Sequence, residues 1–162
     1  MKRLLTPLLC ICMAVVCLSF LGGCEGKNQH TAYSISKSVL ELCSEEVEMT
    51  ALTAEQTANY YGIPDAHLHD FSVHISSADD QYDTVAVFSY TDKEERTVLA
   101  DAVAQTIKTN ETTVKAVNDA EYQKLQNRII MELEDKLILV ISDNFSEIGE
   151  ALEKMGAEKF LP

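Results

Sequence analysis

Basic side chains are scarce in this sequence of 162 residues, which has 13 lysines and arginines against 26 aspartates and glutamates. The formal net charge at pH 7 is −13. Nucleic-acid binding depends on clustered lysine and arginine at the phosphates, so the composition excludes a nucleic acid as partner. Tryptophan is absent, which disfavours carbohydrate binding by ring stacking, although six tyrosines remain.

Glycine is also rare, and its six copies do not form a loop. Two of them are adjacent near the N-terminus, and the other four lie far apart, at Gly26, Gly62, Gly149 and Gly156. The glycine-rich loops that cradle phosphate groups therefore cannot be built. The hydrolase motifs Gly-x-Ser-x-Gly and His-Glu-x-x-His are missing as well. We predict a protein that is not an enzyme and that needs no cofactor.

The first 24 residues differ in composition from the rest of the chain. Lys2 and Arg3 precede an almost wholly apolar run over residues 4–20, and small residues follow, an order typical of a secretory signal. A transmembrane anchor is the alternative, but the run is at the short end for a hydrocarbon core of roughly 30 Å, and Pro7 weakens a helix. The next segment, Leu21-Gly22-Gly23-Cys24, resembles the bacterial lipobox.

The lipobox resemblance implies that a diacylglyceryl group is attached to the Cys24 sulfur and that the signal is cut off before Cys24. Two acyl chains anchor a protein stably where one is marginal. We expect residues 1–23 to be the signal peptide, 24–33 the acylated N-terminus and tether, and 34–162 a single α+β domain. The mature chain would be lipid-anchored on the extracytoplasmic face of the cell membrane. Loss of the two basic residues of the signal takes the net charge from −13 to −15.

The mature chain would keep one free thiol. Of the five cysteines, three leave with the signal and Cys24 becomes a thioether, so Cys43 has no partner for an intramolecular disulfide. The fold must therefore be held by its core alone. Cys43 shares a helical apolar stripe with Val39 and Leu42, which is typical of a buried small hydrophobic residue.

Hydrophobic periodicity predicts two helices followed by two strand-strand-helix units. The Thr53-x-x-Gln56 spacing is that of a capping box and starts the second helix. Residues 45–52 alternate like a strand but form too short a run to decide, and 109–124 reads as loop with a helical turn. In chain order the expected elements are the helices 34–44 and 53–62, the strands 71–76 and 84–90, the helix 92–108, the strands 129–133 and 137–141, and the helix 145–156.

This order predicts an α+β fold with a four-stranded antiparallel sheet. The strands 84–90 and 137–141 are apolar on both faces, so we expect them at its centre. We expect helices 92–108 and 145–156 to cover one face of the sheet. The N-terminal helices would cover the other face, with Ala86, Phe88, Ile138 and Val140. If that second face were uncovered, it would be a site for a protein partner.

The mature chain resembles a family of small bacterial lipoproteins, mostly from low-GC Gram-positive organisms, that carries a domain-of-unknown-function label. The resemblance rests on Tyr61-Gly62-Ile63, on Asp83-Thr84-Val85-Ala86-Val87-Phe88 and on the closing strand 137–142, and it covers roughly residues 40–144. The chain has threonine at position 84, where the family pattern has an acidic residue. The family has no established activity, so the resemblance transfers no catalytic residue.

Histidine supplies the first candidate site. His67, His69 and His74 lie within eight residues, beside Asp65 and Asp70. Two imidazoles at i and i+2 on a strand face the same way, a spacing that zinc sites use. The stretch follows a proline and is predicted to be loop, and surface histidines beside carboxylates are the commoner outcome. Metal binding through these three histidines stays open.

An acidic turn supplies a second candidate site, for calcium. Asp79, Asp80 and Asp83 surround the turn of the first hairpin, and hard cations prefer oxygen ligands. The EF-hand pattern is missing, because the loop has neither its glycine nor its distal glutamate. A solvated turn explains the three carboxylates better than a calcium site does.

We therefore expect a lipid-anchored extracytoplasmic lipoprotein that is not catalytic and acts by contact with another component of the cell envelope. Its partners would be the membrane, through Cys24, and an envelope protein. The alternative is a lipoprotein that binds a small ligand or a metal.

Overall fold

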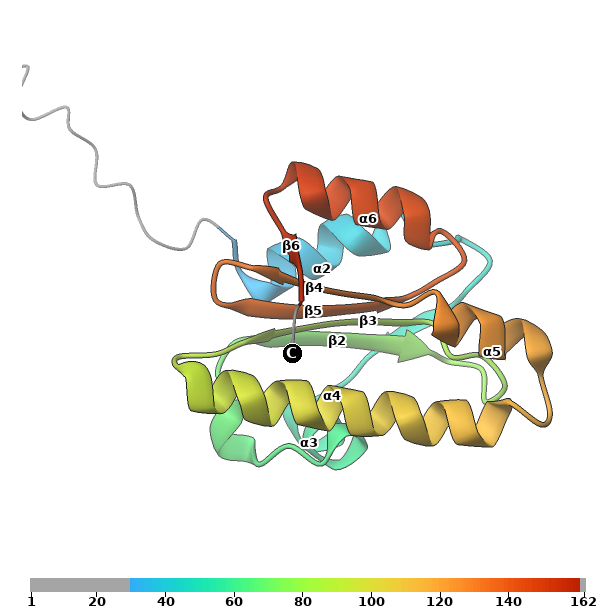
Figure 1. Cartoon of the computed structure of the whole chain (residues 1–162), viewed down its shortest axis with the longest axis horizontal. Helices are drawn as coiled ribbons and strands as arrows, with labels where there is room; N and C mark the ends of the chain where they lie inside the picture. Colours follow the sequence, from blue (N-terminus) through green and yellow to red (C-terminus); the bar gives the residue numbers. More distant parts are fainter. Residues whose placement is uncertain (1–29, 161–162) are drawn as a thin grey trace, which may run out of the picture.

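The computed structural model describes residues 30–160 as one six-stranded antiparallel sheet between two layers of helices (Figure 1). The strand order is β1-β2-β3-β5-β4-β6. The helices are α2 (Ala32–Leu40), α3 (Ala54–Tyr61), the short 3₁₀ helix η1 (Asp65–His67), α4 (Lys93–Val114), α5 (Asp119–Gln126) and α6 (Phe145–Lys154). The strands are β1 (Met49–Ala51), β2 (Phe71–Ser76), β3 (Thr84–Ser89), β4 (Ile129–Leu133), β5 (Lys136–Ile141) and β6 (Glu158–Lys159).

The expected α+β class and antiparallel sheet are confirmed, and β3 and β5 pair at its centre from Thr84↔Ile141 to Ser89↔Lys136. The expected number of four strands is wrong, because β1 and β6 add an edge strand on each side. β1 lies within the segment that sequence left undecided, and β6 pairs through only two residues. Strands this short carry too few side chains for a periodic pattern, so only pairing with a neighbour defines them.

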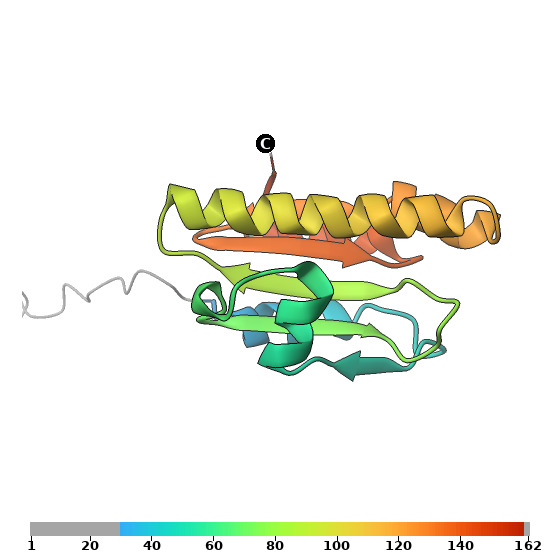
Figure 2. The same cartoon turned by 90° about the horizontal axis from the view of Figure 1, so that it is seen from below.

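The expected distribution of the helices over the two faces is also wrong. Helices α3 and α4 lie on one side of the sheet, and α2 and α6 lie on the other (Figures 1 and 2). The helix pairs that were expected to share a face are therefore split between the two layers. Every residue of β5 is buried, and nearly all of β3 is, so alternation along these strands cannot tell which helix belongs to which face.

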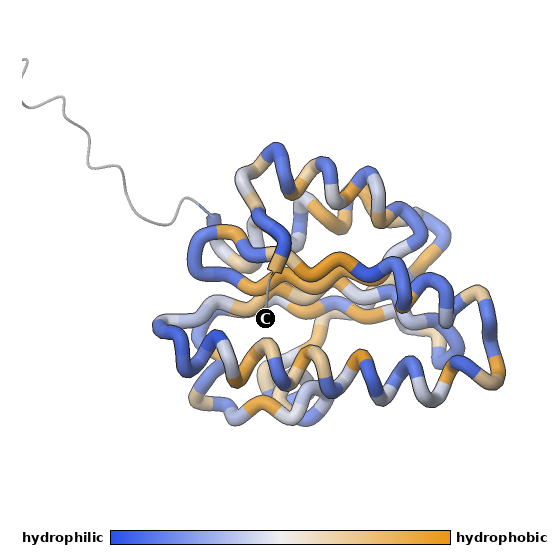
Figure 3. The backbone as a smooth tube through the Cα atoms, in the orientation of Figure 1, coloured by the Kyte–Doolittle hydropathy of each residue, from blue (hydrophilic) through white to orange (hydrophobic). Residues whose placement is uncertain are grey.

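The pairing of β3 with β5 divides the core into two clusters. Ala86 pairs with Leu139, and both belong to the cluster under α3 and α4, together with Phe88 and Leu137. Val87 pairs with Ile138, and both belong to the cluster under α2 and α6. We expected Ala86 and Phe88 to share a face with Ile138 and Val140, but the two pairs lie on opposite faces. A shift of one residue in the pairing of two strands is enough to produce this difference. Hydrophobic residues are concentrated in the central strands, between the polar outer sides of the helices (Figure 3).

Local signals place most helix ends. The capping box of Thr53 and Gln56 is formed, and Gly62 ends α3 in the left-handed conformation with a φ of 66°. Helix α2 starts at Ala32, with Thr31 as its cap, two residues before the expected start. Helix α4 runs to Val114, and α5 occupies much of the segment expected to be loop. No helix of the described residues is long and apolar enough to cross a membrane.

Gly62, which ends α3, and Gly149, within α6, give a matched test of whether the left-handed conformation at position 62 requires glycine. Gly62→Ala is expected to lower the free energy of unfolding by roughly 1–2 kcal/mol, because a Cβ strains the left-handed conformation. No atom lies within 4 Å of the added Cβ, so this loss comes from the backbone alone. Gly149→Ala is the control, since its Cβ makes an ordinary 3.5 Å contact with Ile129 Cδ1. Urea unfolding should show Gly149→Ala as neutral or more stable; equal losses in both variants would contradict the account.

Candidate functional site

The two ends of the sheet are chemically different. At one end the α2 N-terminus is fixed by Asp70, whose Oδ2 accepts hydrogen bonds from Ala32 N and Ser89 Oγ, each at 3.0 Å. We call this the proximal end, because the described part of the chain begins there with α2. The other end, which we call the distal end, is formed by the loops 41–48, 77–83 and 142–144 and by α5 (Figure 1).

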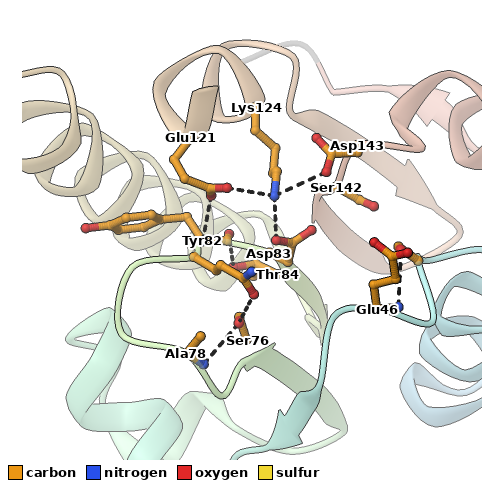
Figure 4. A network of polar contacts seen from close by, with 12 residues as sticks. Glu46, Ser76, Ala78, Tyr82, Asp83, Thr84, Glu121, Lys124, Ser142 and Asp143 are labelled. Atoms are coloured by element: carbon orange, nitrogen blue, oxygen red, sulfur yellow. Dashed lines mark hydrogen bonds and ion pairs between the residues drawn. The ribbon is translucent and has the colours of Figure 1, made fainter. Parts of the chain in front are cut away.

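Lys124 of α5 is the centre of a buried group of charges at the distal end (Figure 4). Its Nζ lies 2.7 Å from Asp83 Oδ2, 2.9 Å from Glu121 Oε1 and 3.4 Å from Asp143 Oδ2. Lys124 and Asp83 are nearly inaccessible, whereas the Asp143 side chain is 70% exposed. We call Asp83, Glu121, Lys124 and Asp143 the distal ion cluster. It ties together three segments that are far apart in the sequence.

One ammonium group faces three carboxylates in this cluster, and the pKa values follow from that imbalance. Burial lowers the pKa of Lys124, but the hydrogen bonds and charges of Asp83 and Glu121 outweigh burial and raise it well above its ordinary value. Burial raises the pKa of Asp83, and Lys124 only partly opposes it because the neighbouring Glu121 and Asp143 also raise it. The lysine is thus held as a cation and is not a nucleophile.

The sequence offered only part of this cluster. Asp83 was one of the three carboxylates of the calcium hypothesis, and the structure instead pairs it with Lys124, 41 residues away. Asp79 and Asp80 are exposed and do not join it. Glu121 and Lys124 lie in the segment expected to be loop; their i,i+3 spacing is the signal that could have placed them on one helix face.

A pocket of about 260 Å³ lies over Asp83 at the distal end. Its walls come from the first hairpin, from the C-terminal end of α3 and from α4. The Ser76 hydroxyl donates to Gln81 Oε1 at 3.0 Å, and Asn110 Nδ2 donates to the Tyr60 hydroxyl oxygen at 3.3 Å. We call this the distal pocket, and its lining includes Tyr60, Ser76, Asp79, Gln81, Tyr82 and Asn110.

The predicted histidines are only partly brought together. His67 Nδ1 and His69 Nε2 each lie 3.2 Å from Oε1 of Glu95, a buried residue in the first turn of α4. The other carboxylate oxygen of Glu95 accepts from Thr91 N at 2.7 Å and from Thr91 Oγ1 at 2.8 Å. Sequence reasoning missed Glu95, which lies 28 residues from His67. This cluster fastens η1 to the start of α4 at the proximal end.

His74 lies elsewhere, on β2, and its buried Nδ1 has no hydrogen-bond partner among the described residues. Burial lowers the pKa of His74, because desolvation disfavours the charged form of its ring. Residues 30–160 contain no group of three or more histidine, cysteine, aspartate and glutamate side chains placed to hold a metal ion. The three predicted histidines therefore do not form one ligand set in this fold.

The sequence singles out two cysteines, Cys24 and Cys43. Cys24 lies outside the described residues. Cys43 is half-buried, with its Sγ 3.5 Å from the Val39 carbonyl oxygen, and it packs against the core under α2 and α6. Burial raises the pKa of the Cys43 thiol, which makes it a poor nucleophile at neutral pH.

A second, larger groove of about 520 Å³ runs along the edge of β4 beside α6. Ile129, Met131 and Phe145 line it, and Phe145 has 36% of its surface exposed. Gly149 opens it, because this position of α6 carries no side chain.

Comparison with family models, with curated proteins and with solved structures finds no match to this chain. The resemblance to the small bacterial lipoproteins therefore stays a prediction.

The buried ammonium of Lys124 is expected to stabilise the fold strongly. Lys124→Met leaves Asp83 and Glu121 without their cation, which should lower the free energy of unfolding by about 3–5 kcal/mol. Combining it with Asp83→Asn should recover part of that loss, because the second change removes a buried unpaired charge. Lys154→Met is the control, since that side chain is 79% exposed and should change stability by less than about 1 kcal/mol. Similar small losses in both lysine variants would contradict the cluster's role.

Glu95 gives a prediction for the dependence of stability on pH. Burial raises its pKa, but the hydrogen bonds from Thr91 and the contacts with His67 and His69 outweigh burial, so the folded pKa lies below 4.5. The stabilisation is therefore present above pH 4.5 and is lost as the pH falls through the folded pKa.

Glu95→Gln should lower the free energy of unfolding by about 1–3 kcal/mol at neutral pH. The difference from wild type should shrink as the pH falls through the folded pKa of Glu95, as measured by urea unfolding at a series of pH values. Glu94→Gln is the control, because that side chain is exposed. A wild-type minus Glu95→Gln difference that is constant with pH would contradict the assignment.

Proposed function

We propose that this chain is a lipid-anchored extracytoplasmic binding domain, without catalytic activity, which acts by contact with another component of the cell envelope. The observation that carries the proposal is the polarity of the fold. Helix α2, the first described element, begins at the proximal end (Figure 1). The distal ion cluster and the distal pocket lie at the other end of the sheet. A tethered domain would thus present its most elaborate surface away from the bilayer.

The dimensions support this arrangement. The polar stretch 25–31 spans at most about 25 Å when extended, so the proximal end would stay near the lipid headgroups. Six residues of β2 separate the two ends of the sheet, which is about 20 Å. The distal end would therefore stand within reach of envelope components close to the membrane surface. The net charge of the mature chain would hold the domain off an anionic lipid surface.

The scarcity of exposed apolar side chains favours recognition by polar contacts. Among the described residues only four large hydrophobic side chains are exposed, and they are scattered: Tyr33, Tyr60, Val117 and Phe145. Both faces of the sheet are covered by helices, so the apolar face that would have suited a protein partner is filled by α2 and α6. The second candidate function, binding of a small ligand, is favoured by the distal pocket.

The anchoring is tested by Cys24→Ala in the native host. The wild-type chain is expected in the membrane fraction and in the detergent phase after phase separation, because two acyl chains hold it there. Cys24→Ala should leave the detergent phase and keep its uncut signal, which shows as a slower band on a gel.

Cys43→Ala is the matched control and should behave as wild type, since a half-buried thiol takes no part in anchoring. Crosslinking of intact cells from a photoreactive residue at Asp143 tests the contact, with the same residue at Tyr33 as its proximal control. A Cys24→Ala chain that partitions and is processed like wild type would overturn the anchor. Equal products from both crosslinking positions would overturn contact through the distal end.

A further inference from the structure

The distal pocket is lined mostly by neutral polar side chains, together with two aspartates. Asp79 has no partner among the described residues, and the hydrogen bond from Ser76 to the Gln81 oxygen leaves the amide nitrogen of Gln81 to donate. The Asn110 amide donates to Tyr60, which leaves its oxygen to accept. The pocket therefore offers both donors and acceptors within one small space.

Two aromatic side chains accompany these polar groups. Tyr60 and Tyr82 both line the pocket, and Tyr60 is 38% exposed. Tyrosine presents an apolar ring face next to a polar hydroxyl, so it contacts ligands that are partly apolar and partly polar. The Tyr60 ring is held edge-on against Tyr61, with ring centroids 5.0 Å apart, which fixes its orientation.

The charges of the pocket argue against anionic ligands and against divalent cations. None of the residues that line it is basic, so phosphates, nucleotides and carboxylates find no counter-charge. Asp83 in its wall is already paired with Lys124. Asp79 then remains as a single free carboxylate, and one carboxylate is too few for a divalent cation. A ligand that is uncharged, rich in hydroxyl groups and has apolar C–H faces matches what is left.

We propose that the distal pocket binds an uncharged saccharide unit of an envelope glycan. The volume of about 260 Å³ is below the roughly 300–1,000 Å³ of sites for drug-sized ligands, so it takes about one sugar ring. Asp79, Gln81 and Asn110 hydrogen-bond to the ring hydroxyls. Tyr60 packs against the C–H face of the ring. Tyr60 supplies the stacking contact in a chain that has no tryptophan.

This inference deepens the proposed function, since it names the class of envelope component that the domain contacts. It stands separately from the anchoring, because sugar binding is measured on purified protein and anchoring is measured by fractionation. A failure of the sugar experiment leaves the lipid anchor in place. A failure of the Cys24→Ala experiment leaves the pocket in place.

The experiment is saturation-transfer NMR on the full chain in zwitterionic detergent, which adds no sugar headgroup. The probes are the trimers of N-acetylglucosamine and of glucose, at about 10 mM, where a site of millimolar affinity is filled. At least one trimer should receive saturation from the protein. Tyr60→Ala and Asp79→Ala should each reduce the transfer at least fivefold, because each removes a direct contact.

Matched controls separate the pocket from general effects. Tyr33→Ala removes an exposed tyrosine at the proximal end, and Asp80→Ala changes the neighbouring carboxylate, which does not line the pocket. Both should keep wild-type transfer. No transfer from either trimer, or equal transfer in all four variants, would overturn the saccharide site. Titration with CaCl₂ alone, followed by tyrosine fluorescence, gives the competing outcome: a response lost in Asp79→Ala, without sugar transfer, would mark a cation site and overturn the proposal.

Discussion

The fold depends on one constraint, the pairing of two strands that are apolar on both faces. β3 and β5 lie side by side at the sheet centre, and every residue of β5 is buried. A sheet with such a centre is unstable in water unless helices cover both of its faces. The two helical layers, α2 with α6 and α3 with α4, meet that requirement with the two separate core clusters. Functional groups are therefore left to the edges and ends of the sheet.

The ends of the sheet carry the charged groups because the strands stop there. At the proximal end, Asp70 and Glu95 accept hydrogen bonds that hold α2 and α4 to the loops. At the distal end, Lys124 joins three carboxylates from three segments. Because the chain has twice as many acidic as basic side chains, few lysines and arginines are available for such clusters. The remaining acidic side chains lie outside these clusters and leave the chain with a net charge far from zero.

Features set by a few neighbouring residues were predicted well. The Thr53 capping box, the Gly62 helix end and both hairpins follow from local backbone chemistry, and all are present. The prediction that α4 and α6 cover the same face was wrong. β3 and β5 are apolar on both sides, so their sequences do not alternate and cannot show which side faces which helix. Helix α5 was missed since it has no clear apolar stripe and is fixed by the Asn118 cap and by Lys124.

The sequence by itself determined the α+β class, the central strands and the acidic charge, because each depends on composition or on spacing within one segment. It also indicated His67 and His69, which are near each other in the chain. Only the tertiary structure decided that both meet Glu95, that His74 does not join them, and that Asp83 pairs with Lys124. These contacts join residues that lie 26 to 41 positions apart, and no local pattern encodes a partner so distant. Their geometry follows from how the helical layers close over the sheet.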